Sequence, residues 1–311
     1  MSARRESGRT LRVLTGCTAA GKSEWALRWA EANSGEILSC DSLLVYRGMD
    51  LGTAKPTPEE RARVPHHLVD VREVTEPMNA PLYASMALRA AEDIAARGRQ
   101  ILVVGGSGFY LRSFFAPVAA GPEVPRAVRE RVDALHASGG LPALVAELRR
   151  LNPGGLGRLD AANPRRVAGA LGRCLASGRT LDELASDFAR AASPFSGWDV
   201  RLVRLERAGP ELDARIAGRA EAMVASGLLD EVARLLGAGL RSNPSAAGAI
   251  GYREAIEVLE GRAPREGLAG AIARATRALV KKQRTWFRTQ LPPHRVVDAA
   301  GLGGPSDLVP G

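Results

Sequence analysis

Short apolar runs alternate with helical patterns over the first 115 residues. Four of these runs predict strands: Leu11–Leu14, Glu36–Cys40, His66–Val71 and Ile101–Val104. Between them, apolar residues recur at helical spacing after Lys22 and again over Tyr83–Arg97, where Gly98 ends the pattern. Buried apolar strands that alternate with helices are typical of a parallel sheet covered on both faces. The pattern therefore predicts an α/β core.

Strand patterns disappear after Phe115. The residues from Arg126 to Arg190 show only helical periodicity, and they follow a hinge-like stretch that contains Pro117, Gly121, Pro122 and Pro125. This helical region is broken at three dipeptides: Gly139-Gly140, Asn152-Pro153 and Asn163-Pro164. Thr180, with Glu183 three residues later, indicates a capping box at the start of a short helix.

The α/β pattern returns near the end of this region. Val200–Leu205 alternates Val and Leu with Arg and predicts one more strand, and the chain from there to Gln290 is helical in pattern. We therefore expect two domains. The core comprises residues 1–116 and 195–311, and a helical insertion of residues 117–194 lies between its two parts.

Composition excludes several classes of protein. The 311 residues, 45% of them hydrophobic, are enough for about two domains of ~100–200 residues each. No apolar run approaches the ~18–20 residues of a membrane span, and the first ten residues lack the apolar stretch of a signal peptide. The 3 cysteines are too few and too scattered for a disulfide framework or a zinc site. We expect a cytoplasmic protein without membrane contact.

The positive charge is concentrated in two regions. The chain carries a formal charge of +9, and the segment from Ala271 to Arg295 holds seven basic residues and no acidic one. From Pro117 to Arg179 there are ten Arg against five acidic residues. Two separate basic regions indicate a polyanion larger than one nucleotide. The alternative is a solvated surface in a protein that prefers arginine, since only 4 of 43 basic residues are lysine.

Residues 16–23 read Gly-Cys-Thr-Ala-Ala-Gly-Lys-Ser and match the phosphate-loop pattern G-x-x-x-x-G-K-[ST]. They follow a predicted strand and open a predicted helix, which is the context that this pattern requires. Glycines let consecutive backbone N–H groups face one concavity, Lys22 adds a point charge, and the Ser23 hydroxyl suits Mg²⁺. The loop predicts a P-loop NTPase-like sheet that binds a di- or triphosphate, as in ATP-binding proteins.

Asp41 directly follows the second predicted strand. In an open α/β sheet, ligands lie beyond the carboxyl ends of the strands, so Asp41 is expected to face the same crevice as the phosphate loop. A carboxylate there could accept a proton from an acceptor nucleophile. It could equally order Mg²⁺ or cap the next turn, and spacing alone favours none of the three.

Residues 39–56 resemble the hallmark segment of tRNA dimethylallyltransferases, which are also called tRNA isopentenyltransferases. Other segments agree in the order of the family, over roughly residues 11–290: Pro65–Leu68 with Asp70, Gly105–Tyr110, Ala249–Glu254 and Lys281–Arg288. The resemblance implies that a dimethylallyl group moves from dimethylallyl diphosphate to the N6 amine of the adenosine 3′ to the anticodon (position 37). The products are N6-isopentenyladenosine and diphosphate.

The resemblance also implies roles for particular residues. In this family the phosphate loop holds the diphosphate of the prenyl donor rather than ATP, which places it on Gly16, Cys17, Thr18, Ala19, Ala20, Gly21, Lys22 and Ser23. Ser23 would hold Mg²⁺ as the cofactor, Asp41 takes the position of the general base, and Arg215 that of the arginine that closes on the diphosphate. Arg219 could serve the site or lie on a solvated helix face.

The other partner implied by the resemblance is the anticodon stem-loop of tRNA, bound by a monomer. The family's tRNA contacts correspond to Asp41, Ser42, Leu43, Leu44, Ser107, Arg129, Arg165, Arg166, Val167, Ala168, Gly169, Gly248, Ala249, Ile250, Gly251, Tyr252 and Arg253. The helical insertion corresponds to the part that clasps the anticodon loop, and the basic run Lys281–Arg288 would support the tRNA from the core.

Some positions depart from the family pattern. Cys17 and Ala20 stand where a Pro and a Ser are common, Ser107 replaces a Thr, and Gly169 stands where an Arg is frequent. No zinc-finger segment follows the core, which is typical of the bacterial form. Three alternatives share parts of these features: a small-molecule kinase, an isopentenyltransferase that acts on free adenine nucleotide, and a tRNA-binding regulator without catalysis.

Overall fold

The computed structural model describes residues 9–118 and 123–308. They form two compact units, one from Met1–Ala116 with Pro194–Gly311 and the other from Pro117–Ser193. The second unit ends one residue before the boundary expected from the sequence. Gly121 and Pro122 of the expected hinge, and residues 1–8 of the segment read for a signal peptide, lie outside the described residues.

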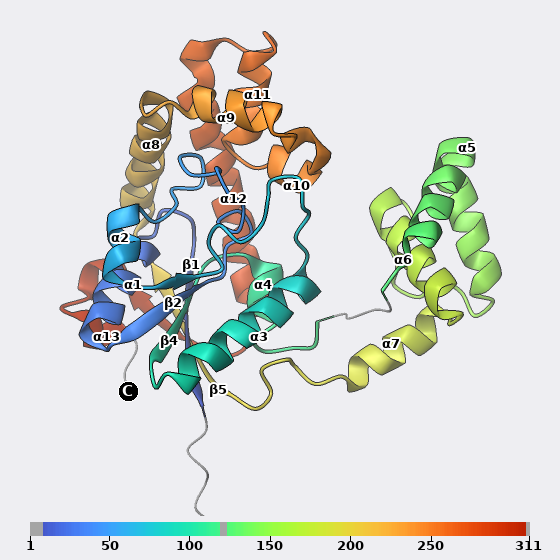
Figure 1. Cartoon of the computed structure of the whole chain (residues 1–311), viewed down its shortest axis with the longest axis horizontal. Coiled ribbons are helices and arrows are strands. Elements are labelled where there is room, and N and C mark those ends of the chain that lie inside the picture. Colours follow the sequence, from blue (N-terminus) through green and yellow to red (C-terminus); the bar gives the residue numbers. More distant parts are fainter. Residues whose placement is uncertain (1–8, 119–122, 309–311) are drawn as a thin grey trace, which may run out of the picture. The chain divides into compact units, whose positions relative to one another are not determined.

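A sheet of parallel strands forms the centre of the first unit (Figure 1). It has six strands in the order β3-β2-β4-β1-β5-β6. The strands are β1 (Thr10–Gly16), β2 (Gly35–Ser39), β3 (His66–His67), β4 (Gln100–Val104), β5 (Asp199–Glu206) and β6 (Arg295–Asp298). Leu14 of β1 and Ser39 of β2 both pair with Val104 of β4, so the carboxyl ends of these three strands lie at one edge. The phosphate loop, Asp41 and the Gly105-Gly106 turn begin there.

Helices cover both faces of this sheet, as the sequence predicts. They are α1 (Lys22–Ala32), α2 (Pro58–Arg63), α3 (Ala80–Ala96), α4 (Gly108–Arg112), α8 (Gly209–Ala225), α9 (Leu228–Gly237), α10 (Pro244–Ala247), α11 (Tyr252–Leu259), α12 (Leu268–Gln290) and α13 (Pro305–Leu308). Trp29 of α1 and Leu308 of α13 pack in one buried cluster, against Leu14 and Val203. Helices α3, α8 and α12 contribute to a larger cluster on the other face.

The second unit is all helical and has a buried core of its own (Figure 1). It contains α5 (Arg126–Leu151), α6 (Pro164–Ser177) and α7 (Leu181–Arg190). Helix α5 is interrupted at Gly140, whose φ of 62° is left-handed, and α6 begins beside Asn163. Helix α5 also ends beside Asn152, so all three expected breaks are confirmed. The predicted capping box of α7 is confirmed, because Thr180 and Glu183 cap each other's backbone N–H groups.

Three local features differ from the sequence prediction. The strand expected over His66–Val71 is only the two residues of β3, because Leu68 and Asp70 adopt positive φ values that turn the chain out of the sheet. Strand β6 was not predicted, since Arg295–Asp298 is short and half polar. Helix α2 was also missed, although Thr57 and Glu60 form a readable capping box. No helix within the described ranges is long and apolar enough to cross a membrane.

Candidate active site

The phosphate loop connects β1 to α1 by a tightly curled backbone. Gly16 packs so closely on β5 that a Cβ there would lie 2.4 Å from the carbonyl oxygen of Leu205. Ala19 and Gly21 adopt left-handed φ values of 67° and 96°. Since a residue other than glycine rarely takes such a φ, surrounding contacts must hold Ala19 in place.

Two arginines supply contacts of this kind. The Nε of Arg215, on α8, donates to the carbonyl oxygen of Ala19 at 3.0 Å, and the Nε of Arg207 donates to that of Ala20 at 3.1 Å. Arg215 is largely exposed, whereas the side chain of Arg207 is only 8% exposed and forms an ion pair with Glu211. The sequence identified Arg215 by resemblance but gave no signal for Arg207, which lies outside the loop motif.

Lys22 begins α1 and turns back toward the loop. Its Nζ lies 2.9 Å from the carbonyl oxygen of Gly16 and 2.8 Å from that of Cys17. Burial lowers the pKa of Lys22 to about 8, although the nearby charge of Asp41 opposes this shift. The ammonium group is therefore held where an anion on the loop would meet it, and an anion would favour its charged form.

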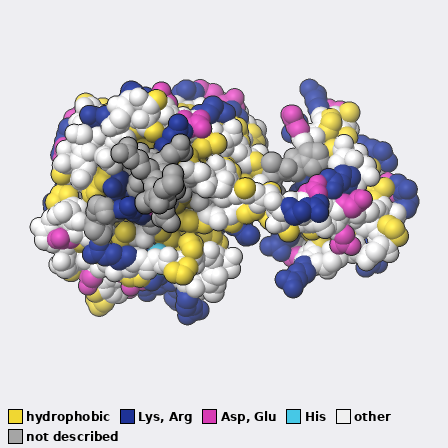
Figure 2. All heavy atoms as spheres, turned by 90° about the horizontal axis from the view of Figure 1, so that it is seen from below, with side chains coloured by type: hydrophobic (Ala, Val, Ile, Leu, Met, Phe, Trp, Pro, Cys, Tyr) yellow, Lys and Arg dark blue, Asp and Glu magenta, His cyan; other side chains and the backbone are white. Residues whose placement is uncertain are grey.

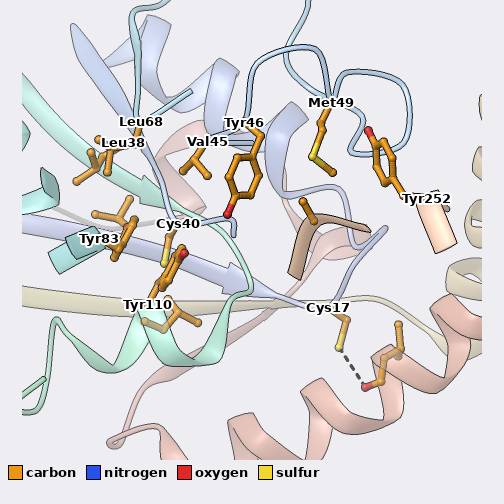
Figure 3. Close-up of a cluster of buried hydrophobic side chains, with 14 of the residues drawn as sticks. Cys17, Leu38, Cys40, Val45, Tyr46, Met49, Leu68, Tyr83, Tyr110 and Tyr252 are labelled. Atoms are coloured by element: carbon orange, nitrogen blue, oxygen red, sulfur yellow. Dashed lines mark hydrogen bonds between the residues drawn. The ribbon is translucent and has the colours of Figure 1, made fainter. Parts of the chain in front are cut away.

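Cys17, which departs from the family pattern, packs in the main core. Figure 3 shows its Sγ pointing toward the backbone oxygen of Val280 on α12, at 4.0 Å. Burial raises the pKa of the Cys17 thiol. The buried thiol of Cys17 therefore fills a packing position between the loop and α12.

Asp41 lies where two cavities of the first unit meet. Its Oδ1 accepts the backbone N–H of Leu43 at 2.9 Å, so the carboxylate does cap the next turn. It also lines a cavity of about 360 Å³ and another of about 920 Å³. The residues common to both cavities are Thr18, Ala19, Asp41, Thr53 and Arg219. Capping one turn and facing the cavities are therefore compatible roles.

The two cavities differ in chemistry. The larger combines apolar side chains with charged and hydroxyl ones, among the latter Lys22, Ser23 and Arg215. The walls of the smaller are mainly apolar and include Ile216 of α8 and Ile272 of α12. A diphosphate suits the first surface and an uncharged hydrocarbon or base suits the second.

Arg219 is not on a solvated helix face. The side chain lines both cavities, and its guanidinium donates to the carbonyl oxygen of Thr53 at 2.9 Å. Burial lowers the pKa of Arg219, and the charge of Asp41 partly offsets that effect. The structure thus excludes a solvated helix face for Arg219 and places a cation beside the carboxylate.

The other residues of the first unit that are predicted to contact tRNA fall into two groups. Ser42, Leu43, Ser107 and Ile250 line the smaller cavity, and Leu44 lines the larger. Gly248 and Arg253 are exposed, Ala249 is half-buried, and Gly251 is buried. Next to Ser107, the ring of Phe109 is 76% exposed at the edge of the smaller cavity.

Tyr252 is in the core rather than at a surface. It is fully buried, and its hydroxyl donates to Glu231 at 2.6 Å. The carboxylate of Glu231 also accepts the backbone N–H groups of Asp50, Leu51 and Gly52. The Tyr252 ring therefore holds the 50–52 segment in place, and its side chain offers no surface to a nucleic acid.

In the second unit, the expected contacts are arginines around the start of two helices. Arg129 and Arg165 are exposed, and Arg166 pairs with Asp160 at 3.1 Å. Val167 is buried in the core of this unit, with Ala168 and Gly169 half-buried beside it. Figure 2 shows Lys and Arg side chains, with Asp and Glu among them, over the surface of this unit.

Comparison with known proteins decides the family. The model of the IPP transferase family matches residues 44–290. A tRNA dimethylallyltransferase of Opitutus terrae is 66% identical over 292 residues, which cover 94% of each chain. The chain belongs to the tRNA dimethylallyltransferase family. A second relative of the same name, from Deinococcus radiodurans, is 41% identical over 90% of each chain.

Solved structures of the family agree. A full-length tRNA isopentenylpyrophosphate transferase of Bacillus halodurans aligns with a TM-score of 0.66 and 31% identity, over 93% of this chain and 90% of that one. A eukaryotic dimethylallyltransferase, solved acting on tRNA, aligns with a TM-score of 0.79 over 94% of this chain and 74% of that one. Its identity is 23%, so this second likeness bears on the fold alone. The P-loop NTPase-like fold predicted from the phosphate loop is confirmed.

Proposed function

We propose that this member of the tRNA dimethylallyltransferase family transfers the dimethylallyl group of dimethylallyl diphosphate to the N6 amine of the adenosine at position 37 of tRNA. One observation carries the proposal: a polar and an apolar cavity meet at a single carboxylate, Asp41. This arrangement suits a reaction in which a charged leaving group and an uncharged acceptor base approach from two sides.

The diphosphate of the donor binds in the larger cavity, on the loop of residues 16–23. Lys22 and Arg215 line this cavity and Arg219 lies where it meets the smaller one, so three cations surround the place where negative charge develops. Such preorganised charges stabilise the departing diphosphate more than the bound donor, because the diphosphate gains a further negative charge as the bond to carbon breaks. We assign the dimethylallyl group to the smaller, mainly apolar cavity, where Thr18, Ala19 and Ile216 line the wall.

Asp41 accepts the proton of the acceptor amine. The exocyclic nitrogen attacks the allylic carbon, the bond from that carbon to the diphosphate oxygen breaks, and its electron pair leaves with the diphosphate. The amine then carries a proton in excess, which passes to the Asp41 carboxylate. An adenine amine is a weak nucleophile, so a base at this place lowers the barrier.

The residues at the start of α1 fit a Mg²⁺ ion. Ser23 is exposed at the first turn and lines the polar cavity, and Mg²⁺ in such sites takes one or two protein oxygens together with phosphate oxygens and water. Ser23 would hold the ion, which when bound adds positive charge to the diphosphate. Among the described residues there is no group of three or more His, Cys, Asp or Glu side chains that could hold a metal ion.

The anticodon stem-loop of tRNA binds to the two basic regions. The exposed Arg129, Arg165 and Arg166 of the second unit and Lys281 and Lys282 of α12 provide contacts for its phosphates. The target base must leave its stack to reach Asp41 in the cavity. We propose that the enzyme acts as a monomer in the cytoplasm.

The decisive experiment incubates the protein with Mg²⁺, dimethylallyl diphosphate and a mixture of tRNA, AMP and ATP. Nucleosides of the digested tRNA are then analysed by mass spectrometry. We expect N6-isopentenyladenosine from tRNA, with AMP and ATP unmodified. Prenylated AMP or ATP would favour the nucleotide isopentenyltransferase, phosphate transfer from ATP would favour the kinase, and tRNA binding without any product would favour the regulator.

A further inference from the structure

The basic helix α12 also reaches the donor loop. Gln283 lies within the run Lys281–Arg288, but unlike the exposed Lys281, Lys282 and Arg284 it is half-buried. Its side chain lines the smaller cavity, as that of Lys282 also does. Its amide oxygen accepts the backbone N–H of Thr18 at 3.0 Å. Its amide nitrogen donates to the carbonyl oxygen of Gly106 at 3.3 Å.

One amide therefore joins the two loops that carry the two halves of the site. Thr18 belongs to the phosphate loop, and Gly106 directly precedes Ser107 on the acceptor side. The backbones of the two loops also lie close together, because a Cβ built on Gly106 would lie 3.1 Å from the carbonyl oxygen of Gly16. The same Cβ would lie 2.8 Å from the amide nitrogen of the Gln283 side chain. Cys17 contacts α12 one turn earlier, at Val280 (Figure 3).

The amide of Gln283 matches the chemistry of the contact. A backbone N–H only donates and a backbone carbonyl only accepts, so the bridging side chain must offer one acceptor and one donor a short distance apart. A carboxylate could accept from Thr18 but would turn its second oxygen toward the Gly106 carbonyl. A thioether of the same length could do neither.

We infer that Gln283 is a positioning residue, which sets the distance between the donor loop and the acceptor loop by bonding Thr18 and Gly106 at once. The inference rests on the proposed function for its effect on turnover. Its direct consequence, an ordered Thr18 peptide, exists in the protein without substrates and can be measured there. A displacement of about 1 Å between reacting groups can cost on the order of 10²-fold in rate, so such a bridge matters to catalysis without touching substrate.

The test uses the full chain and three variants. Gln283→Met keeps the length of the side chain and removes both bonds, and Gln283→Glu keeps the acceptor and removes the donor. Gln290→Met is the control, because Gln290 is an exposed residue of the same helix that bonds to Thr289. Hydrogen exchange of the Thr18 amide is followed by NMR, and turnover is measured with both substrates saturating, together with the melting temperature.

We expect the Thr18 amide to exchange at least tenfold faster in Gln283→Met and at the normal rate in Gln283→Glu. Turnover should fall by about 10- to 100-fold in both variants, with the melting temperature and the affinity for a tRNA stem-loop near those of the normal protein. Unchanged exchange in Gln283→Met, turnover within twofold of normal, or an equal loss in Gln290→Met would each overturn the inference.

Failure of the proposed function would be distinguishable from failure of this inference. If the unaltered protein transferred no dimethylallyl group to tRNA, the proposed function would be wrong. The Thr18 exchange rate and the affinity of the loop for inorganic pyrophosphate would then decide the role of Gln283. Faster exchange with weaker pyrophosphate binding in Gln283→Met alone would support it, and the absence of either change would overturn it.

Discussion

The two units of the molecule use arginine and lysine in different ways. In the α/β unit, the cations of the site are tied to main-chain oxygens: Lys22 to Gly16 and Cys17, Arg215 to Ala19, and Arg219 to Thr53. In the helical unit, arginines extend from the surface and pair with nearby carboxylates, as Arg166 does with Asp160 and Arg150 with Glu147.

The difference reflects what each unit has to do. A side chain bound to a backbone carbonyl has little freedom, which suits a reaction that needs charges within a fraction of an ångström of their targets. Exposed ion pairs contribute little to stability and exchange partners easily, which suits binding to a phosphate backbone. We therefore expect substitution of the site cations in the first unit to change turnover and stability, and substitution of the exposed arginines in the second unit to change tRNA binding.

The largest effect is expected at Asp41. Asp41→Asn keeps the shape and the bond to the Leu43 N–H but removes basicity, so turnover should fall by ~10²–10⁴-fold with little change in tRNA affinity. The control is Asp199→Asn, at the start of β5 and thus at the opposite edge of the same sheet. Single-turnover transfer measures both. Near-normal turnover in Asp41→Asn would remove Asp41 from the role of base.

A second contrast concerns stability. Glu231 is buried and accepts three backbone N–H groups and the Tyr252 hydroxyl, so Glu231→Gln places an NH₂ group among donors and should cost about 2–3 kcal/mol of unfolding free energy. In the second unit, Glu147 pairs with the exposed Arg131 and Arg150, and Glu147→Gln should cost much less. Urea unfolding of both variants compares them; equal losses would contradict the distinction between the units.

The exposed arginines of the second unit should contribute part of the salt dependence of tRNA binding. Each phosphate contact contributes a slope of about −0.7 to −0.9 in log affinity against log salt, so replacing Arg165 and Arg166 by Ala should flatten the slope by nearly two units. The KM for tRNA should rise, while that for dimethylallyl diphosphate stays unchanged. Asp160→Asn, which frees Arg166 from its pair, is the matched control and should not weaken binding. Filter binding at several salt concentrations gives the slopes, and an unchanged slope in the double variant would assign both arginines to the solvated surface.

The sequence could predict those parts of the site that directly follow a recognisable strand. The loop at residues 16–23 and Asp41 follow strands whose apolar runs are plain, so their meeting at one sheet edge was foreseeable. Arg207, Glu231 and Gln283 could not be assigned a role, because their partners lie 187, 180 and 265 residues away in the chain. Tyr252 shows the opposite problem: its segment is diagnostic of the family, but only packing reveals that its side chain is internal.

The effect expected to be smallest at neutral pH is the pH dependence that Lys22 gives to the first unit. Its pKa of about 8 in the free protein lies below the ordinary value of 10.5, because burial disfavours the charged form. Between these two values the unfolded chain binds more protons than the folded one, so the contribution of Lys22 to stability rises with pH across this window and is constant below it. Lys22→Met should remove that rise, which melting temperatures measured from pH 7 to 10 would detect.

A bound diphosphate favours the ammonium form of Lys22 and raises its pKa, so binding takes up a proton above pH 8. Relative to Lys22→Arg, which stays charged, the affinity of the normal protein for pyrophosphate should therefore decline by up to about tenfold for each pH unit above 8. The comparison cancels the titration of pyrophosphate itself, and parallel pH profiles for the two proteins would mean that the Lys22 ammonium does not face the anion.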